Sequence, residues 1–162
     1  MSIERKKSTI NLYFVSRLLG PLALMVENDY GEELCELIDY SKPEHCELVI
    51  KSLILPLFIR LDEKTTLEVK KSLGYLINNS GNSVDFIEDK LLLCGIPPDN
   101  FYMFMEKLWS ILFPDEISFV YNKNSFKLKN KPLTMDQFNF SVKSEKTIGT
   151  MINELHNHLL NI

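Results

Sequence analysis

Apolar residues recur at intervals of three or four positions through most of the chain, and proline or glycine repeatedly interrupts this pattern. Such spacing places apolar side chains along one face of an α-helix, and that face must be buried against another element. A succession of short helices of this kind predicts a compact, mainly helical domain of about seven helices. The periodic segments are residues 9–19, 21–28, 31–40, 41–57, 62–77, 83–94, 97–112 and 144–159.

The segment 31–40 separates its apolar and acidic positions most clearly. As a helix, it would carry an apolar face made of Leu34, Leu37 and Ile38. Its opposite face would be acidic and made of Glu32, Glu36 and Asp39. Like charges at this spacing lower the stability of a helix. Their presence together therefore indicates that this face has a function, such as binding.

Side chains that cap helices mark where several of the other helices begin. Ser41, followed by Pro43, predicts the start of a helix that is apolar on most sides and is therefore expected to be central, with a kink at Pro56. Asp62, Ser83 and Ser144 are expected to cap three later helices.

The sequence pattern changes after residue 116. Residues 117–129 are rich in β-forming residues on both sides of Asn122-Lys123-Asn124-Ser125, which predicts a hairpin, and residues 138–142 alternate like a further strand. We therefore expect a mainly α fold with a small β element (α+β). The β element would be a hairpin or sheet of two or three strands near residues 117–142, within one globular domain spanning residues 1–162.

Composition and targeting signals favour a folded protein of the cytoplasm. The 162 residues include 45% hydrophobic and 25% charged residues, which excludes wholesale disorder. Arg17 interrupts the apolar stretch near the N-terminus, and no apolar run approaches the roughly 20 residues of a membrane span. The three cysteines, an odd number without Cys-x-x-Cys spacing, are expected to be buried thiols: Cys35, Cys46 and Cys94.

No pattern in the sequence indicates a catalytic centre, a metal or a cofactor. His156 and His158 are two positions apart, so on a helix they point away from each other and cannot chelate one ion. Glycine-rich phosphate-binding motifs and a Gly-x-Ser-x-Gly motif are both missing. We therefore expect a protein that is not an enzyme and uses no cofactor. A hydrolase with an unrecognised acidic site stays open as an alternative, because sequence gives no distances between carboxylates.

Charge is distributed unevenly along the chain, although the net charge is only −4. Residues 27–47 contain eight acidic residues against Lys42, whereas residues 123–146 contain six lysines against Asp136 and Glu145. Both regions could be no more than solvated faces, and they could also pair with each other inside the fold. Alternatively, the acidic region could dock a basic protein, because clusters of one sign steer association. The predicted partner-binding residues are Glu32, Glu33, Glu36, Asp39, Tyr40, Glu44 and Glu47.

In general composition the chain resembles the small cytoplasmic immunity proteins that neutralise bacterial toxins. The resemblance implies an inhibitor that blocks a basic toxin, for example a nuclease, through its acidic face, with neither nucleic acid nor membrane as its partner. One alternative is an adaptor that receives a partner helix in an apolar groove lined by Phe101, Met105 and Trp109. The aromatic residues of the basic hairpin could also stack on RNA; they are Phe119, Tyr121 and Phe126.

Overall fold

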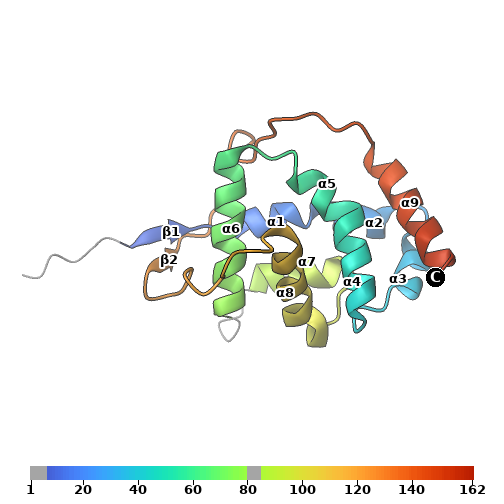
Figure 1. The fold of residues 1–162 in the computed structure, drawn as a ribbon, viewed down its shortest axis with the longest axis horizontal. Helices are drawn as coiled ribbons and strands as arrows, with labels where there is room; N and C mark the ends of the chain where they lie inside the picture. Colours follow the sequence, from blue (N-terminus) through green and yellow to red (C-terminus); the bar gives the residue numbers. More distant parts are fainter. Residues whose placement is uncertain (1–6, 80–84) are drawn as a thin grey trace, which may run out of the picture.

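Short helices follow one another through the first third of the chain and pack side by side. The computed structural model describes residues 7–79 and 85–162 and is mainly helical (Figure 1). Gly20 and Pro21 are the first residues of the second helix, and Pro43 begins the fourth, because proline suits the first turn of a helix. These helices are α1 (Tyr13–Leu18), α2 (Gly20–Glu27), α3 (Gly31–Leu37) and α4 (Pro43–Val49).

The central helix is kinked where proline predicts it. The helix α4 continues into the π-helical segment η1 (Ile50–Ile54) and then into α5 (Leu55–Phe58). Pro56 lies in the first turn of α5 and has no N–H group for the helical hydrogen-bond pattern. The wider π-helical turn of η1 directly before it accommodates this missing hydrogen bond. Ile50, Leu53 and Ile54 are fully buried, which confirms that this is a core helix.

Two longer helices follow the central helix along the chain, and the second of them packs against it. The Asp62 side chain accepts a hydrogen bond from Thr65 N and caps α6 (Glu63–Asn78), as predicted. The predicted cap Ser83 lies outside the described residues. The remaining helical elements of this half are α7 (Asp85–Leu93), the 3-10 turn η2 (Pro98–Asn100) and α8 (Phe101–Leu112).

The small β element forms, but with an unexpected partner strand. β1 (Ser8–Ile10) and β2 (Phe126–Leu128) pair in parallel, with Thr9 opposite Lys127. The hairpin predicted around residues 122–125 is wrong, because residues 118–125 form turns and β2 pairs with the N-terminal segment instead. Ile10 correspondingly belongs to a strand rather than to the first helix.

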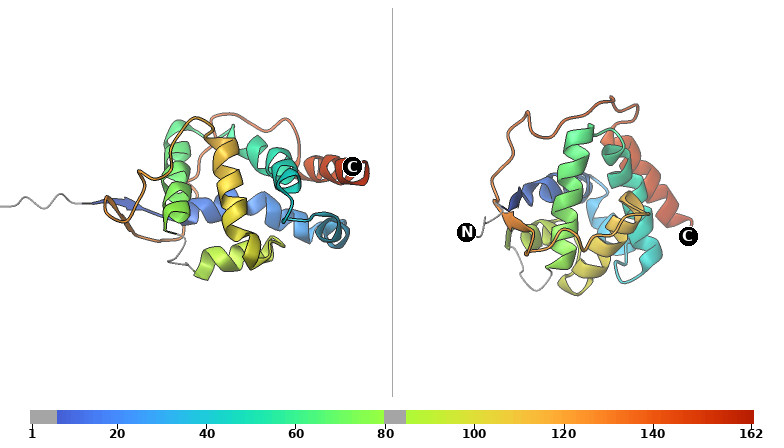
Figure 2. Two further views of the ribbon diagram at one scale, coloured as in Figure 1. Left: turned by 60° about the horizontal axis from the view of Figure 1, so that its bottom comes forward. Right: turned by 60° about the vertical axis from the view of Figure 1, so that its left-hand side comes forward.

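The rest of the predicted β region is mostly irregular. The strand predicted at residues 138–142 is reduced to one antiparallel bridge between Phe140 and Leu61. We call residues 114–147 the connecting segment, since they run along the outside of the helices from α8 to the last helix (Figure 2). That helix, α9 (Ile148–Leu160), is capped by Thr147 and begins later than the predicted cap Ser144.

The expected fold class, mainly α with a small β element, is confirmed. One continuous apolar core joins α1, α2, the central helix, α6, α8 and α9. Among the described residues, no helix is long and apolar enough to cross a membrane. α3, the start of α4 and α9 lie at one end of the long axis, and the β strands lie at the other (Figure 1).

Candidate protein-binding surface

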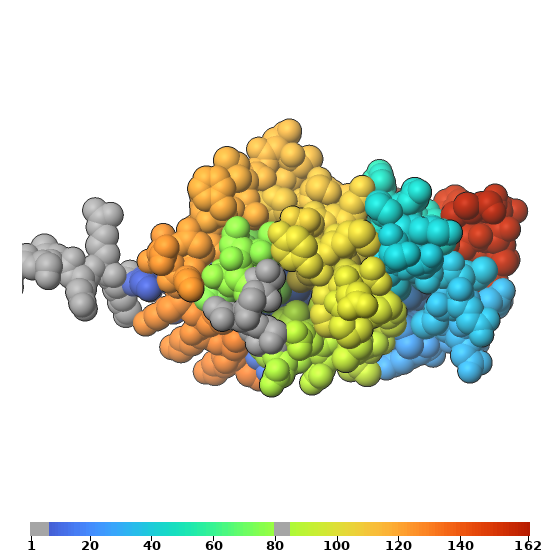
Figure 3. All heavy atoms as spheres, turned by 90° about the horizontal axis from the view of Figure 1, so that it is seen from below, coloured from blue at the N-terminus to red at the C-terminus, as the bar shows by residue number. Residues whose placement is uncertain are grey.

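Five carboxylates are exposed together at the end of the molecule formed by α3 and the start of α4. We call this surface the acidic end and define it by Glu32, Glu33, Glu36, Asp39 and Glu44. Viewed from below, residues 30–50 and the C-terminal helix make up this end, far from residues 120–135 (Figure 3).

A glycine fixes how α3 meets α2. A Cβ atom on Gly31 would lie 2.0 Å from the backbone oxygen of Val26, so no larger residue fits there without moving the backbone. Leu34 then buries the inner side of α3, which turns Glu32, Glu33 and Glu36 toward solvent. The acidic residues are therefore presented on a helix whose position is set by close packing.

Asp39 reaches the acidic end from a loop rather than from α3. The helix ends at Leu37 and Ile38 is extended, so the predicted helical face of Glu32, Glu36 and Asp39 is not continuous. The backbone N–H of Asp39 donates to Nδ1 of His45, 2.9 Å away, which fixes this loop against α4. Hydrogen bonds from the hydroxyl and backbone N–H of Ser41 lower the pKa of the Asp39 carboxyl.

Tyr30 and His156 extend the acidic end with a small aromatic cluster. The Tyr30 ring is 44% exposed and stacks on His156 of α9, with ring centroids 4.7 Å apart. Oε1 of Glu33 lies 3.1 Å from Nε2 of His156. This nitrogen is buried and makes no well-aligned hydrogen bond, so the contact is one of charge alone and is attractive when His156 is protonated. The sequence gives no sign of this cluster, since it depends on packing between α3 and α9.

Two of the predicted partner-binding residues do not belong to the surface. Tyr40 is only 5% exposed and packs edge-on against Phe104, so its prediction as an interface anchor is wrong. Its hydroxyl has no hydrogen-bond partner in the described part of the chain, and burial raises its pKa. Glu47 contacts Lys51 at 2.6 Å and Lys107 at 3.3 Å, hydrogen bonds that lower its pKa and neutralise it locally.

The lysines of the basic region do not neutralise the acidic end. Within residues 7–79 and 85–162, no lysine or arginine forms an ion pair with a carboxylate of the acidic end. Lys146 pairs with Glu154 at 3.0 Å, while β2 and its lysines lie at the opposite end of the molecule (Figure 1). The hypothesis that the two charged regions pair with each other inside the fold is therefore wrong.

Most of the side chains predicted to bind a partner helix or to stack on RNA are buried or partly buried. Met105 and Trp109 are buried in the core, so the predicted helix-binding groove on α8 is not available. Phe119 is 60% exposed, but Tyr121 and Phe126 are partly buried and pack against each other beside Trp109. A full set of stacking groups is therefore not displayed.

Catalytic chemistry gains no specific support from the described residues. The buried polar side chains there are Thr65 and Ser72, neither of them acidic, so the buried carboxylate pair that would favour the hydrolase alternative is not found among the described residues. No group of three or more potential metal ligands occurs among them either. Cys46 and Cys94 are buried as predicted, but Cys35 is exposed on α3, which contradicts the prediction for that thiol.

No protein-family model, curated protein sequence or solved structure matches this chain.

Proposed function

We propose that the chain is an inhibitory binding protein of the immunity type, which neutralises a basic toxin in the cytoplasm by covering it with the acidic end. The observation that carries this proposal is a set of five exposed carboxylates without a lysine or arginine partner in the described part of the chain. A basic protein would supply the missing countercharges.

The form of the surface supports protein binding over simple solvation. The helix α3, set against α2 by Gly31, holds three of the carboxylates, so docking requires little ordering of the backbone that carries them. Tyr30 adds an exposed aromatic ring that His156 already orients, and such rings are frequent anchors at interfaces. Clusters of one charge also accelerate association with a partner of the opposite charge.

A nuclease is the toxin class that fits this surface best. Its active-site cleft must attract phosphate groups and is therefore basic. A row of carboxylates can occupy that cleft in place of the phosphates, which blocks the substrate without any chemistry by the inhibitor. No enzymatic activity is needed for this function.

The test compares the wild type with a variant in which Glu32, Glu36 and Asp39 are replaced by lysine. Each protein is immobilised and exposed to a lysate of its source cells, and retained proteins are identified at low and at moderate salt. We expect the wild type to retain a basic protein whose activity it inhibits. The charge reversal should slow association with that protein by roughly tenfold or more and flatten the dependence of the rate on salt.

A matched control reverses three exposed carboxylates elsewhere: Asp89, Asp99 and Glu145. This control has the same net charge as the first variant and should keep the partner and most of the association rate. Equal losses in both variants would show that only total charge matters. Unchanged binding in the first variant would contradict a role for the acidic end.

A further inference from the structure

A groove with apolar walls runs between the central helix and the part of the chain that leads into α9. It consists of two hollows, one of about 360 Å³ beside α2 and one of about 600 Å³ beside α5 and α9. Arg60 and Met151 line both hollows, so the two adjoin each other. We call them together the Arg60 groove. It shares no residue with the acidic end, so a role for it does not depend on the proposed function.

Apolar side chains are left uncovered along the whole Arg60 groove. Ile59 is 68% exposed and Val142 is also exposed in the larger hollow, and Leu24 is exposed in the smaller one. Single exposed apolar residues are ordinary, but a contiguous apolar groove with a polar rim marks a binding site. A small molecule would fill one hollow and leave the apolar side chains of the other in water. A peptide segment can cover both.

Two arginines flank a pair of aromatic rings in the smaller hollow. The guanidinium carbon of Arg60 lies 4.4 Å from the centre of the Phe140 ring, and Nε of Arg60 donates to the Val142 oxygen, 3.2 Å away. The guanidinium carbon of Arg17 lies 5.7 Å from the centre of the Phe138 ring. The Phe138 and Phe140 rings pack edge-on with their centres 5.9 Å apart. The ring contact and the hydrogen bond together fix the orientation of the Arg60 guanidinium group.

The smaller hollow is positively charged. Neither arginine pairs with a carboxylate of the described residues, and no carboxylate among them lines this hollow. Lys146 also lines it, but this lysine already pairs with Glu154. The two terminal nitrogens of Arg60 therefore stay available, and their planar arrangement matches the two oxygens of one carboxylate.

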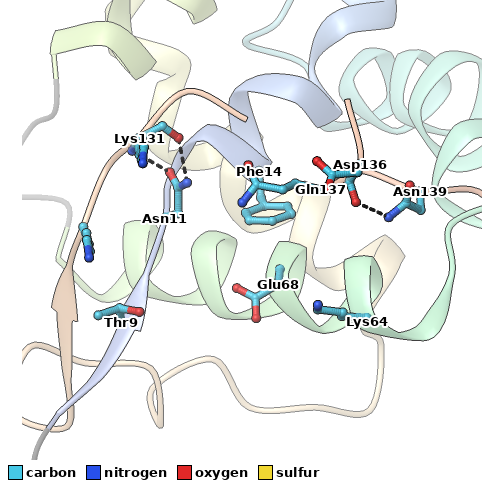
Figure 4. A pocket seen from close by; sticks show the side chains of 10 residues that line it. Thr9, Asn11, Phe14, Lys64, Glu68, Lys131, Asp136, Gln137 and Asn139 are labelled. Carbon is cyan, nitrogen blue, oxygen red and sulfur yellow. Dashed lines mark hydrogen bonds between the residues drawn. The ribbon is translucent and has the colours of Figure 1, made fainter. Parts of the chain in front are cut away.

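The polar cavity between α6 and the connecting segment lacks this selectivity. Figure 4 shows the carboxylates of Glu68 and Asp136 among the side chains that line it. Lys64 and Lys131 lie at opposite ends of the same cavity (Figure 4). Its charged groups are of both signs and do not converge, in contrast to the single oriented guanidinium group of Arg60.

We propose that the Arg60 groove binds a linear peptide segment of a partner protein, in which an aspartate or glutamate lies beside apolar side chains. The carboxylate pairs with the guanidinium group of Arg60, and the apolar neighbours cover the exposed side chains of both hollows. Arg17 attracts a second acidic residue of the same segment. Grooves lined by apolar side chains are a common way of recognising peptides, and charges at the rim select among them.

Selection from a phage-displayed library of random dodecapeptides tests this groove, with the full chain immobilised. We expect the enriched peptides to combine an acidic residue with apolar neighbours. The dissociation constant of the corresponding synthetic peptide is then measured by fluorescence anisotropy. Arg60→Gln should raise it by roughly tenfold or more, because a charge-assisted, two-point contact is lost. Basic peptides would instead bind the acidic end, so the two proposals fail separately.

Two control variants are matched to the groove variants. Lys127→Gln changes the net charge as R60Q does, at an exposed lysine of β2 that lies outside the groove, and should bind the peptide like the wild type. Ile59→Ser should weaken binding by roughly threefold or more, since less apolar surface is buried. Ile117→Ser changes an isoleucine of similar exposure, 63%, outside the groove and should leave binding unchanged. I59S keeps the Arg60 hydrogen bond, so it stays informative if R60Q loosens the segment around Val142.

Three results would overturn the proposal. The first is a selection that enriches no acidic peptide, or basic peptides alone. The second is equal weakening in R60Q and K127Q together with equal weakening in I59S and I117S. The third comes from vesicles of phosphatidylglycerol: if the chain bound these vesicles through Ile59 and bound no acidic peptide, the groove would be a membrane contact instead.

Discussion

The helices and the connecting segment are held in place by different forces. Almost every helix contributes fully buried apolar side chains to one core. In the connecting segment, by contrast, Phe138 is the only buried residue between residues 114 and 147. Four apolar side chains of the segment pack against the core but are only partly buried: Tyr121, Phe126, Leu128 and Leu133. Polar contacts with the helical body hold much of the remaining segment, mostly through its backbone.

These polar contacts occur at the ends of secondary structure elements. Asn11, just after β1, binds the backbone of Lys131, and the Asn130 side chain accepts from Leu12 N at 2.9 Å. The Thr65 hydroxyl, near the start of α6, accepts from Asn139 N at 3.1 Å. Further along, the backbone oxygen of Arg60 accepts from Ser141 N at 2.8 Å. The segment is thus attached at successive points, and each attachment contributes only modestly to stability.

The difference bears on the acidic end. Except for Asp39, which lies in the loop after α3, its carboxylates belong to helices of the body, where apolar packing fixes their positions. Substitutions that separate these two kinds of stabilisation are therefore informative about this surface.

The largest expected effect comes from removing a core side chain. Phe104 is fully buried and packs against Tyr40, so Phe104→Ala should lower the free energy of unfolding by about 3–5 kcal/mol. Urea titration followed by circular dichroism measures this loss. Phe119→Ala, the same change at an exposed position of the connecting segment, should alter stability by no more than about 0.5 kcal/mol. Similar losses in both variants would contradict the contrast between the two regions.

The features of the helical body that could be predicted from sequence are those set by local chemistry. Asp62 caps α6 because its side chain reaches an N–H group three residues ahead, a contact that sequence spacing alone specifies. Pro56 distorts the central helix for an equally local reason. Helical periodicity also predicts that Glu32 and Glu36 of α3 lie on the face opposite the apolar one, and both are exposed.

The features that escaped prediction depend on contacts between distant residues. β2 has the composition of a strand, but nothing near it reveals that its partner is the N-terminal segment and that the pairing is parallel. Tyr40 was predicted as an interface anchor because tyrosine is frequent at interfaces. The chain instead turns inward after α3 ends and buries this side chain against Phe104 of α8. The attachment of Asn11 to the backbone of Lys131 escaped prediction for the same reason, because the two residues meet only in the folded chain.

A smaller effect is expected from releasing the connecting segment at one attachment. Asn11→Ala removes the hydrogen bonds that the side chain makes with Lys131 and with Tyr13 N. Water can replace part of this bonding at the surface, so the global loss should be about 1 kcal/mol. Amide hydrogen exchange should accelerate at Lys131 and Tyr13 while the amides of α8 keep their protection.

Asn157→Ala is the matched control, because this exposed asparagine of α9 makes no side-chain hydrogen bond with another described residue. It should leave exchange at Lys131 unchanged. If Asn11→Ala accelerated exchange in α8 as strongly as at Lys131, the segment would be part of the same cooperative unit as the core, and the contrast would not hold.

The smallest effect is expected at Asp62, where the two regions meet. Its side chain caps α6, and its backbone N–H donates to the carbonyl oxygen of Asn139, 2.9 Å away. The hydrogen bond from Thr65 lowers the pKa of the Asp62 carboxyl below its value in the unfolded chain. The resulting stabilisation is complete above the unfolded pKa and is lost as the pH falls through the folded one.

Asp62→Asn keeps a good capping residue but removes this titration. The variant should therefore match the wild type closely at pH 7 and lose less stability on acidification to pH 3, as measured by urea titration. Asp99→Asn, at an exposed carboxylate without a hydrogen-bond partner among the described residues, should follow the wild-type curve. If all three proteins lost the same stability between pH 7 and pH 3, the Asp62 cap would not contribute to the pH dependence of stability.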